Sequence, residues 1–263
     1  MSYAPFVPLR VFSSYTMLDG AVDPKAIAKT AAERGFPAIA ITDRNGLYGS
    51  VAFAKACKDV GVQPVIGTML AVARPEREGA STPGFGAASP TIDWLALYAQ
   101  DSTGYDNICH LVSRAHLDRP LEFAPHVVLA DLVGHTEGLL CLTACGEGAL
   151  TRLLADGQQT AAETYVARLE ELFPDRLYIE LARRGDKAEE AAEDALVEMA
   201  YARNLPLVAT NPACFAERGF YQAHDAMLCI ASSTHVDSPD RPRSSQEWWI
   251  KPAPVMEHLF QDI

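Results

Sequence analysis

The regular alternation of short apolar runs with longer segments of helical spacing constrains the fold of this chain more than any other feature. Short apolar runs bounded by turn residues are typical of buried strands, and the segments between them suit amphipathic helices. Strands that alternate with helices predict a parallel sheet covered by helices. Seven runs are predicted to be strands, and they cover residues 6–12, 38–42, 63–73, 93–99, 138–143, 176–182 and 205–210.

The segments between these runs carry helix signals. The clearest signals belong to residues 24–34, because Asp23 can cap the first turn, Pro24 suits the first helical position and Gly35 ends the helix. Further helices are predicted over residues 50–60, 103–117, 147–173 with a break near Gly157, 186–203, 220–230 and from 255 onward.

This order of elements predicts a closed or nearly closed parallel α/β barrel, whose functional loops follow the carboxyl ends of the strands. A doubly wound open sheet is the competing architecture. Against it, no Gly-x-Gly-x-x-Gly motif follows the first run, and the sequence has no Gly-x-x-x-x-Gly-Lys-Ser/Thr motif. The barrel is therefore the preferred prediction.

The length and composition of the chain suit one large core. With 263 residues, of which 49% are apolar, residues 1–254 are predicted to form a single barrel domain. Residues 74–91 are rich in Gly, Pro, Ser and Ala and are predicted to be a flexible insertion. Residues 232–254 form an irregular tail rich in Ser, Pro and Asp, and residues 255–263 begin a helix that leads out of the domain.

The charge and the cysteines narrow the class of protein. Because 34 acidic residues outnumber 22 basic ones, the formal charge is -12 and the average surface repels phosphate backbones. The six cysteines contain no Cys-x-x-Cys pair, the N-terminus lacks the pattern of a secretion signal, and every apolar run is shorter than the roughly 20 residues that span a bilayer. We therefore expect a cytoplasmic protein with free thiols, without membrane contact and without a grip on DNA by itself.

Several motifs occur in the order of a known family. Residues 9–20 (Leu-Arg-Val-Phe-Ser-Ser-Tyr-Thr-Met-Leu-Asp-Gly) resemble the opening motif of the PHP (polymerase and histidinol phosphatase) domain that begins the alpha subunit of bacterial DNA polymerase III. Residues 41–49, 63–67, 103–107, 138–145, 173–181, 205–211 and 241–243 are similar to later parts of that domain. The resemblance implies a distorted seven-stranded (β/α)7 barrel of the TIM type, in agreement with the strand count.

The resemblance also locates the metal cleft of the family. Nine positions of this chain correspond to places that ligate metal ions in active relatives, and they are Arg10, Phe12, Asp19, Arg44, Met69, Asp93, Cys145, Pro212 and Cys214. Of these, Asp19 and Cys145 keep residue types of the family. The His-x-His that ends the first strand of relatives reads Arg-x-Phe here, and all seven histidines of this chain lie after residue 109.

The replaced residues argue against a metal ion. Phe12, Met69 and Pro212 offer none of the nitrogen, thiolate or carboxylate ligands that zinc and manganese require. A guanidinium stays protonated, and at about 4 Å from a divalent ion, with an effective dielectric of about 20, the repulsion is on the order of 8 kcal/mol. The sequence therefore predicts no metal, no other cofactor and no catalytic residue in this segment.

Two arrangements of the cleft arginines stay open. In one, Arg10 or Arg44 takes the space of the former ion and pairs with Asp19 or Asp93, so that an ion pair replaces the metal. In the other, both arginines point to solvent and the aspartates cap loops. The position of each guanidinium relative to these carboxylates separates the two.

Other residues have weaker functional interpretations. Cys145 and Cys214 with Asp19 could form a sparse metal site, and Cys145 with His224 could form a nucleophile and base, but buried free thiols are common in cores. Trp248 and its neighbours form an aromatic cluster in a polar tail. This cluster could pack on the barrel or on the remainder of a polymerase, and the second is preferred.

The resemblance implies three candidate functions. The preferred one is a catalytically silent PHP domain of the replicative polymerase, which supports the polymerase part, docks the proofreading exonuclease subunit and meets DNA only through the full polymerase, a DNA-directed nucleotidyltransferase. The second is an active metal-dependent phosphoesterase or 3'-5' exonuclease. The third is the PHP domain of the error-prone alpha-subunit paralogue, although residues 17–21 (Met-Leu-Asp-Gly-Ala) look more like the replicative form.

Overall fold

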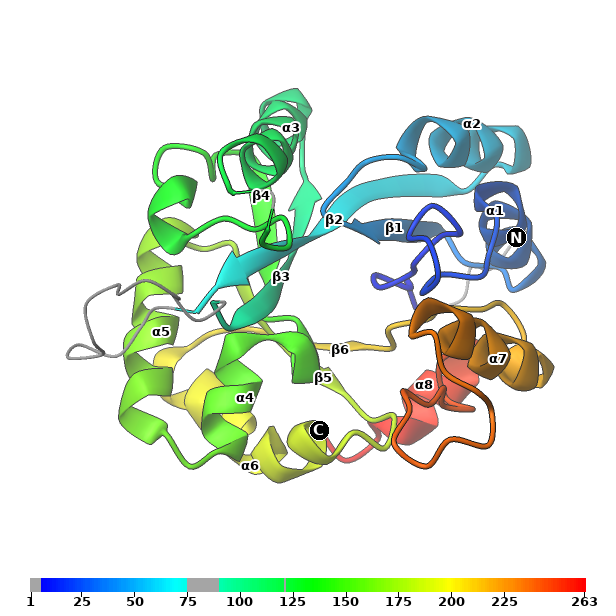
Figure 1. Cartoon of the computed structure of the whole chain (residues 1–263). Helices are drawn as coiled ribbons and strands as arrows, with labels where there is room; N and C mark the ends of the chain where they lie inside the picture. The colour runs from blue at the N-terminus through cyan, green and yellow to red at the C-terminus, as the bar shows by residue number, and fades with distance from the viewer. Residues whose placement is uncertain (1–5, 75–89, 121) are drawn as a thin grey trace.

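The computed structural model describes residues 6–74, 90–120 and 122–263. Six strands in these residues form one mixed sheet in the order β1 to β6, which curves into a half-barrel with helices around it (Figure 1). The strands are β1 Ala38–Arg44, β2 Gln63–Ala73, β3 Ile92–Ala99, β4 Leu139–Leu142, β5 Leu177–Ala182 and β6 Leu207–Thr210.

Helices occur in every segment where the sequence predicts them. As expected, the Asp23 side chain caps the first one by accepting a hydrogen bond from the Lys25 amide at 2.8 Å, and Gly157 separates two helices. The helices are α1 Pro24–Glu33, α2 Ser50–Val60, α3 Ser102–Leu117, α4 Ala149–Ala155, α5 Gln159–Leu172, α6 Lys187–Arg203, α7 Tyr221–Ala231 and α8 Ala253–Leu259.

The direction of β3 differs from the prediction of a parallel sheet. The pairs β1–β2, β4–β5 and β5–β6 are parallel, whereas β3 runs antiparallel to both β2 and β4. A parallel neighbour requires a crossover, usually a helix, and residues 74–91 carry no helix signal. The missing helix signal was therefore evidence for an antiparallel pair. Most of the predicted flexible insertion, residues 75–89, lies outside the described residues.

The predicted first strand, residues 6–12, is an irregular segment in the structure. Its carbonyls at Pro8 and Val11 accept hydrogen bonds from β1, and its other side exchanges two 2.9 Å bonds with Ala213, which follows β6. The segment thus lies between the two ends of the half-barrel. Pro8 has no backbone N–H to donate, which limits a regular ladder here. The predicted closed barrel of seven strands is not confirmed.

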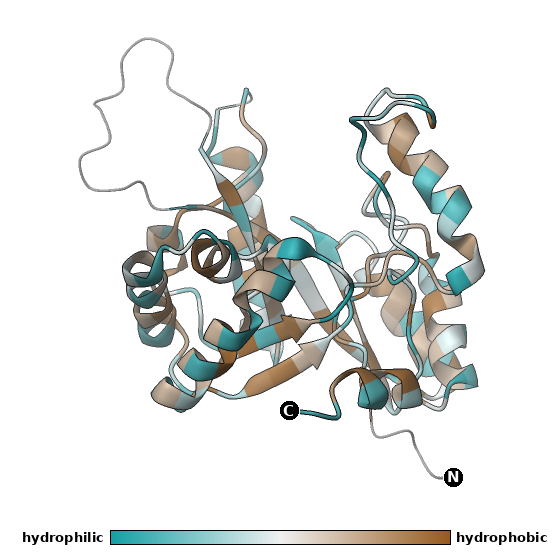
Figure 2. Cartoon of the chain, turned by 90° about the horizontal axis from the view of Figure 1, so that it is seen from below, coloured by the Kyte–Doolittle hydropathy of each residue, from teal (hydrophilic) through white to brown (hydrophobic). Residues whose placement is uncertain are grey.

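Two hydrophobic clusters form the core. The larger one lies between the strands β2 to β5 and the helices α3 to α6, and the smaller one lies between the N-terminal segment, β1, α1 and α2. Figure 2 shows apolar strands surrounded by helices on which hydrophilic and hydrophobic residues alternate. The two clusters meet along the sheet, so the loops after β1, β4 and β6 are anchored on packed elements.

The tail behaves as predicted in one respect and not in another. Residues 232–252 contain neither helix nor strand, as expected. The aromatic cluster, however, packs on the barrel, which is the less preferred of its two predicted positions. The backbone of Trp248 accepts hydrogen bonds from Cys214 and Phe215, and Ile250 is fully buried. In the described part of the chain, no helix is long and apolar enough to cross a membrane.

Candidate functional site

The side chains of Arg44 and Asp19 meet at the end of β1. Arg44 donates from Nε to Asp19 Oδ2 at 2.7 Å and from Nη2 to Glu147 Oε1 at 2.6 Å. Its guanidinium lies between the rings of Phe12 and Trp94, 4.8 and 4.6 Å from their centroids. Aromatic faces attract cations, so the rings hold this charge in place. The sequence-based pairing of Arg44 with Asp19 is therefore present.

Arg10 is completely buried and has different partners from those predicted. Its Nη1 donates to both carboxylate oxygens of Glu180, at 3.0 and 2.8 Å, and its Nη2 donates to Glu147 Oε2 at 3.2 Å. Glu180 is also fully buried and accepts a further hydrogen bond from the Thr210 hydroxyl. A buried charge is tolerated when it is paired and hydrogen-bonded, and this pair meets both conditions.

Glu147 joins the two arginines into one chain of charges. Burial by itself raises the pKa of Glu147, but the charges of Arg44 and Arg10 outweigh it and lower that pKa to about 2. The carboxylate is therefore ionised throughout the physiological range. The resulting ion-pair chain runs, in spatial order, through Asp19, Arg44, Glu147, Arg10 and Glu180.

The loop that carries Asp19 is fixed by Asp43 on β1. The Asp43 carboxylate accepts hydrogen bonds from the Ser13 amide, the Ser13 hydroxyl and the Thr16 hydroxyl, each at 2.8 Å. Gly20 closes the loop so tightly that a Cβ there would lie 2.0 Å from the Ser13 carbonyl oxygen. These contacts set the position from which Asp19 reaches Arg44.

A comparison with protein families identifies the domain. Residues 8–184, which include the loop of Asp19 and all five members of the ion-pair chain, match the PHP domain family. The chain belongs to the PHP domain family. Three members of the ion-pair chain, Arg10, Asp19 and Arg44, are among the nine positions that the sequence predicts for metal ligands of active relatives, and Glu147 and Glu180 bind the two arginines.

The relatives of this PHP domain are proteins much longer than this chain. The chain is 40% identical to DNA polymerase III subunit alpha of Caulobacter vibrioides over 98% of its length, and 35% identical to that of Escherichia coli K12 over its whole length. It spans about a fifth of these relatives, 22% of each. A putative metal-dependent phosphoesterase from Bifidobacterium adolescentis has the same fold, with a TM-score of 0.52, 12% identity, and coverage of 78% of this chain and 86% of that one.

Asp93 does not join the cleft arginines, contrary to one of the predicted pairings. Its carboxylate binds Arg74 at 2.6 and 2.9 Å and Arg152 at 2.9 Å. The antiparallel register places it opposite Val72, three residues further along β2 than Met69, which lies opposite Arg44. The antiparallel direction of β3 therefore gives Asp93 partners other than the predicted ones.

The remaining predicted ligand positions contribute no free ligand. Met69 and Pro212 are buried, and neither carries a metal-binding group of the hard or nitrogen type. Burial raises the pKa of the Cys145 thiol well above its usual range, and its Sγ lies 3.5 Å from Thr210 Oγ1. Cys145 and His224 have separate partners, which gives no support to a nucleophile and base pair.

One group of described residues is spaced like a set of metal ligands, but its donor atoms are protonated or already bound to other groups. Ligand atoms of Asp19, Cys214 and His224 lie within 4.8 Å of one another. Both ring nitrogens of His224 have partners at 2.7 Å, the Asp19 carbonyl and the Ser244 hydroxyl. Burial raises the pKa of Cys214 well above its usual range, and Arg44 already binds the Asp19 carboxylate. This donor set does not fit a divalent ion.

Sequence reasoning missed Glu147, Glu180 and Trp94. Glu180 did carry a signal, since it is the single charged residue in the apolar run Leu177–Ala182 and a buried carboxylate requires a cation. Glu147 and Trp94 carried none, because a charged residue after a short strand and a tryptophan in a strand are both common.

Proposed function

We propose that this chain is the N-terminal PHP domain of a DNA polymerase III alpha subunit, and that it supports the polymerase without hydrolysing phosphodiesters itself. The similarity to alpha subunits over the whole chain supports the parent protein. The ion-pair chain supports the catalytic silence, because two guanidinium groups occupy positions that the sequence predicts for metal ligands of active relatives. The full protein would be a DNA-directed DNA polymerase.

The ion-pair chain also supports a structural role. It connects five parts of the chain that are far apart in the sequence. These are the N-terminal segment, the loop of Asp19, the strand β1, the turn that follows β4, and the strand β5. Removing one member of the fully buried pair of Arg10 and Glu180 would leave an uncompensated charge and cost about 3–5 kcal/mol.

Metal analysis tests the catalytic silence. We expect the purified protein to contain far less than one zinc or manganese ion per chain, and to hydrolyse no phosphodiester when either ion is added. The measurements are elemental analysis and the release of product from a labelled single strand. A stoichiometric ion together with hydrolysis would refute the proposal and establish an active phosphoesterase.

We also infer that the rim of the cleft docks the proofreading exonuclease subunit. The loop 13–20 is bonded to the end of β1, directly before the segment 45–51, because Thr16 binds both the Asp43 carboxylate and the Arg44 amide. Five apolar side chains on these segments are exposed by 43–81%, namely Tyr15, Met17, Leu18, Tyr48 and Val51. Exposed apolar side chains gathered on neighbouring loops are typical of protein–protein contacts.

A pair of lysine substitutions tests this rim. In the full polymerase, Met17→Lys with Val51→Lys is expected to weaken binding of the exonuclease subunit about tenfold or more, because charges enter an apolar contact. The measurement is a titration by light scattering or calorimetry. Ile230→Lys is the control, since Ile230 is 71% exposed on α7, six residues beyond His224, through which α7 contacts the loop 13–20. Equal affinities of the unsubstituted polymerase, the double lysine variant and the control variant for the exonuclease subunit would exclude the rim as the docking surface.

A further inference from the structure

The last strand of the sheet is less covered than its neighbour. Leu207, Val208 and Ala209 on β6 are each only partly buried, whereas most of β5 is fully buried. The helix that follows β6 in the sequence, α7, packs elsewhere. His224 of α7 lies against the Phe215 ring at 5.2 Å, and other α7 contacts go to the irregular tail. The chain therefore supplies β6 with incomplete cover.

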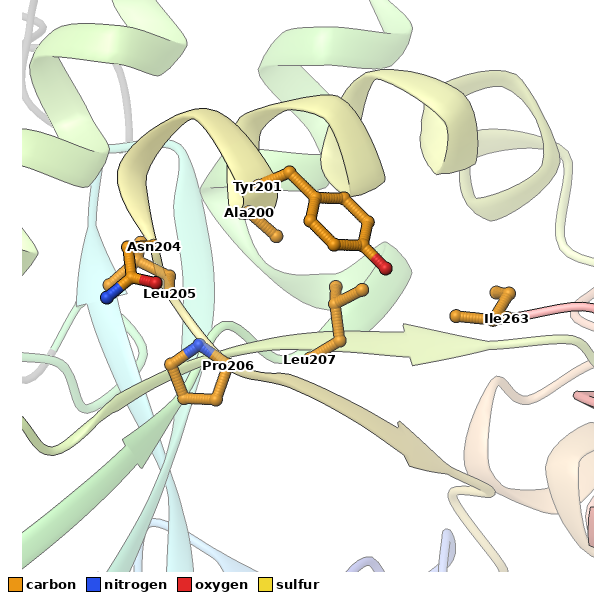
Figure 3. A pocket seen from close by; sticks show the side chains of 7 residues that line it. All are labelled: Ala200, Tyr201, Asn204, Leu205, Pro206, Leu207 and Ile263. Carbon is orange, nitrogen blue, oxygen red and sulfur yellow. The ribbon is translucent and has the colours of Figure 1, made fainter.

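A cavity of about 430 Å³ lies beside this strand. It opens between the end of α6, the loop before β6 and the C-terminal residue, as Figure 3 shows. Its walls are mainly apolar, with Tyr201, Leu205, Leu207 and Ile263 around it. Tyr201 is 75% exposed and Ile263 is 51% exposed, so large apolar side chains border the opening on two sides.

The backbone reaches this cavity in a fixed direction. Arg183 donates to the Leu259 carbonyl and to both carboxylate oxygens of Asp262, at 2.6 and 2.9 Å, and its guanidinium lies 5.0 Å from the centre of the Phe260 ring. Ile263 follows the held Asp262 directly and forms part of the cavity wall. Any residues attached to Ile263 therefore start at this opening.

We propose that the stretch of the polymerase chain that directly follows residue 263 packs apolar side chains into this cavity and covers β6. This inference rests on the proposed function, in which the chain is one part of a longer alpha subunit whose relatives are more than four times its length. A tethered segment is favoured over a separate protein because attachment at the rim gives it a high effective concentration. In this arrangement the partly covered strand β6 is the contact between the domain and the polymerase part.

Photo-crosslinking in the full-length polymerase tests this occupant. Tyr201→p-benzoylphenylalanine keeps the size of the ring, and Leu117→p-benzoylphenylalanine is the control, because Leu117 is 79% exposed at the end of α3. After irradiation, we expect an intrachain product from position 201 that joins it to the stretch following residue 263, at several-fold higher yield than from position 117. Peptide mapping by mass spectrometry identifies the joined residues.

Other products would overturn the inference. Crosslinks from position 201 to the exonuclease subunit, to a second copy of the chain, or at the low yield of position 117 each exclude the proposed occupant. Primer extension by the unsubstituted full-length protein tests the parent function separately. A chain with the predicted crosslink but without polymerase activity would refute the proposed function and support the packing. An active polymerase without the crosslink would support the proposed function and refute the packing.

Discussion

At the scale of single residues, two arginines and three carboxylates form the ion-pair chain, and the sequence predicts only part of this arrangement. The ion pair of Arg44 and Asp19 could be predicted from the sequence, because both residues were expected in the same cleft and carry opposite charges. The partners of Arg10 could not, because Glu147 and Glu180 come close only through the packing of β4 and β5. Long-range topology therefore decides which carboxylate neutralises a buried arginine.

Glu147→Gln tests the centre of the ion-pair chain. The pKa of Glu147 falls from 4.5 to about 2 on folding, so its ionised form stabilises the protein above the unfolded pKa, and this stabilisation is lost as pH falls through the folded pKa. We expect the variant to lose about 2–3 kcal/mol of unfolding free energy at pH 7 and about half of that or less at pH 3. Urea unfolding at both pH values measures this.

Glu171→Gln is the matched control for Glu147→Gln. Glu171 pairs with Arg168 on the surface of α5 and its side chain is 65% exposed, so its loss is expected to change the unfolding free energy by less than about 1 kcal/mol. A Glu147→Gln variant as stable as this control would show that the ion-pair chain contributes little to holding the cleft.

At the scale of elements, local signals located the helices and failed on strand direction. Caps and glycines mark helix ends within a few residues of sequence, and α1 shows this with Asp23, Pro24 and Gly35. The direction of β3 depends on whether its connection to β2 forms a crossover, and no local signal states that directly. The N-terminal segment reads as a strand from its apolar residues, but its bonds to β1 and Ala213 are too few for a ladder.

The loop of Asp19 provides a prediction at this scale. Gly20→Ala is expected to destabilise the domain by about 2 kcal/mol or more, because its Cβ would overlap the Ser13 carbonyl and displace the loop. Gly219→Ala is the control, since a Cβ there has no neighbour within 4 Å among the described residues. Thermal unfolding of both variants measures the difference, and similar melting temperatures would show that the loop adapts without cost.

At the scale of the whole molecule, the half-barrel presents two surfaces with different proposed roles. The cleft rim, with Met17 and Val51, faces away from the packed core and suits a separate subunit. The cavity beside β6 lies at the C-terminal residue and suits the same chain. The net charge of -12 agrees with a domain that leaves the nucleic acid to other parts of a polymerase.

The buried pair of Arg10 and Glu180 has a consequence for the cell that contains this protein. A domain braced by an imported ion is complete only after that ion arrives, and its integrity then follows the supply of zinc or manganese. Here the stabilising ion pair consists of side chains of the chain itself and is present as soon as the polypeptide folds. In the proposed role, nutritional starvation for transition metals would leave the assembly of the replication machinery at this domain untouched.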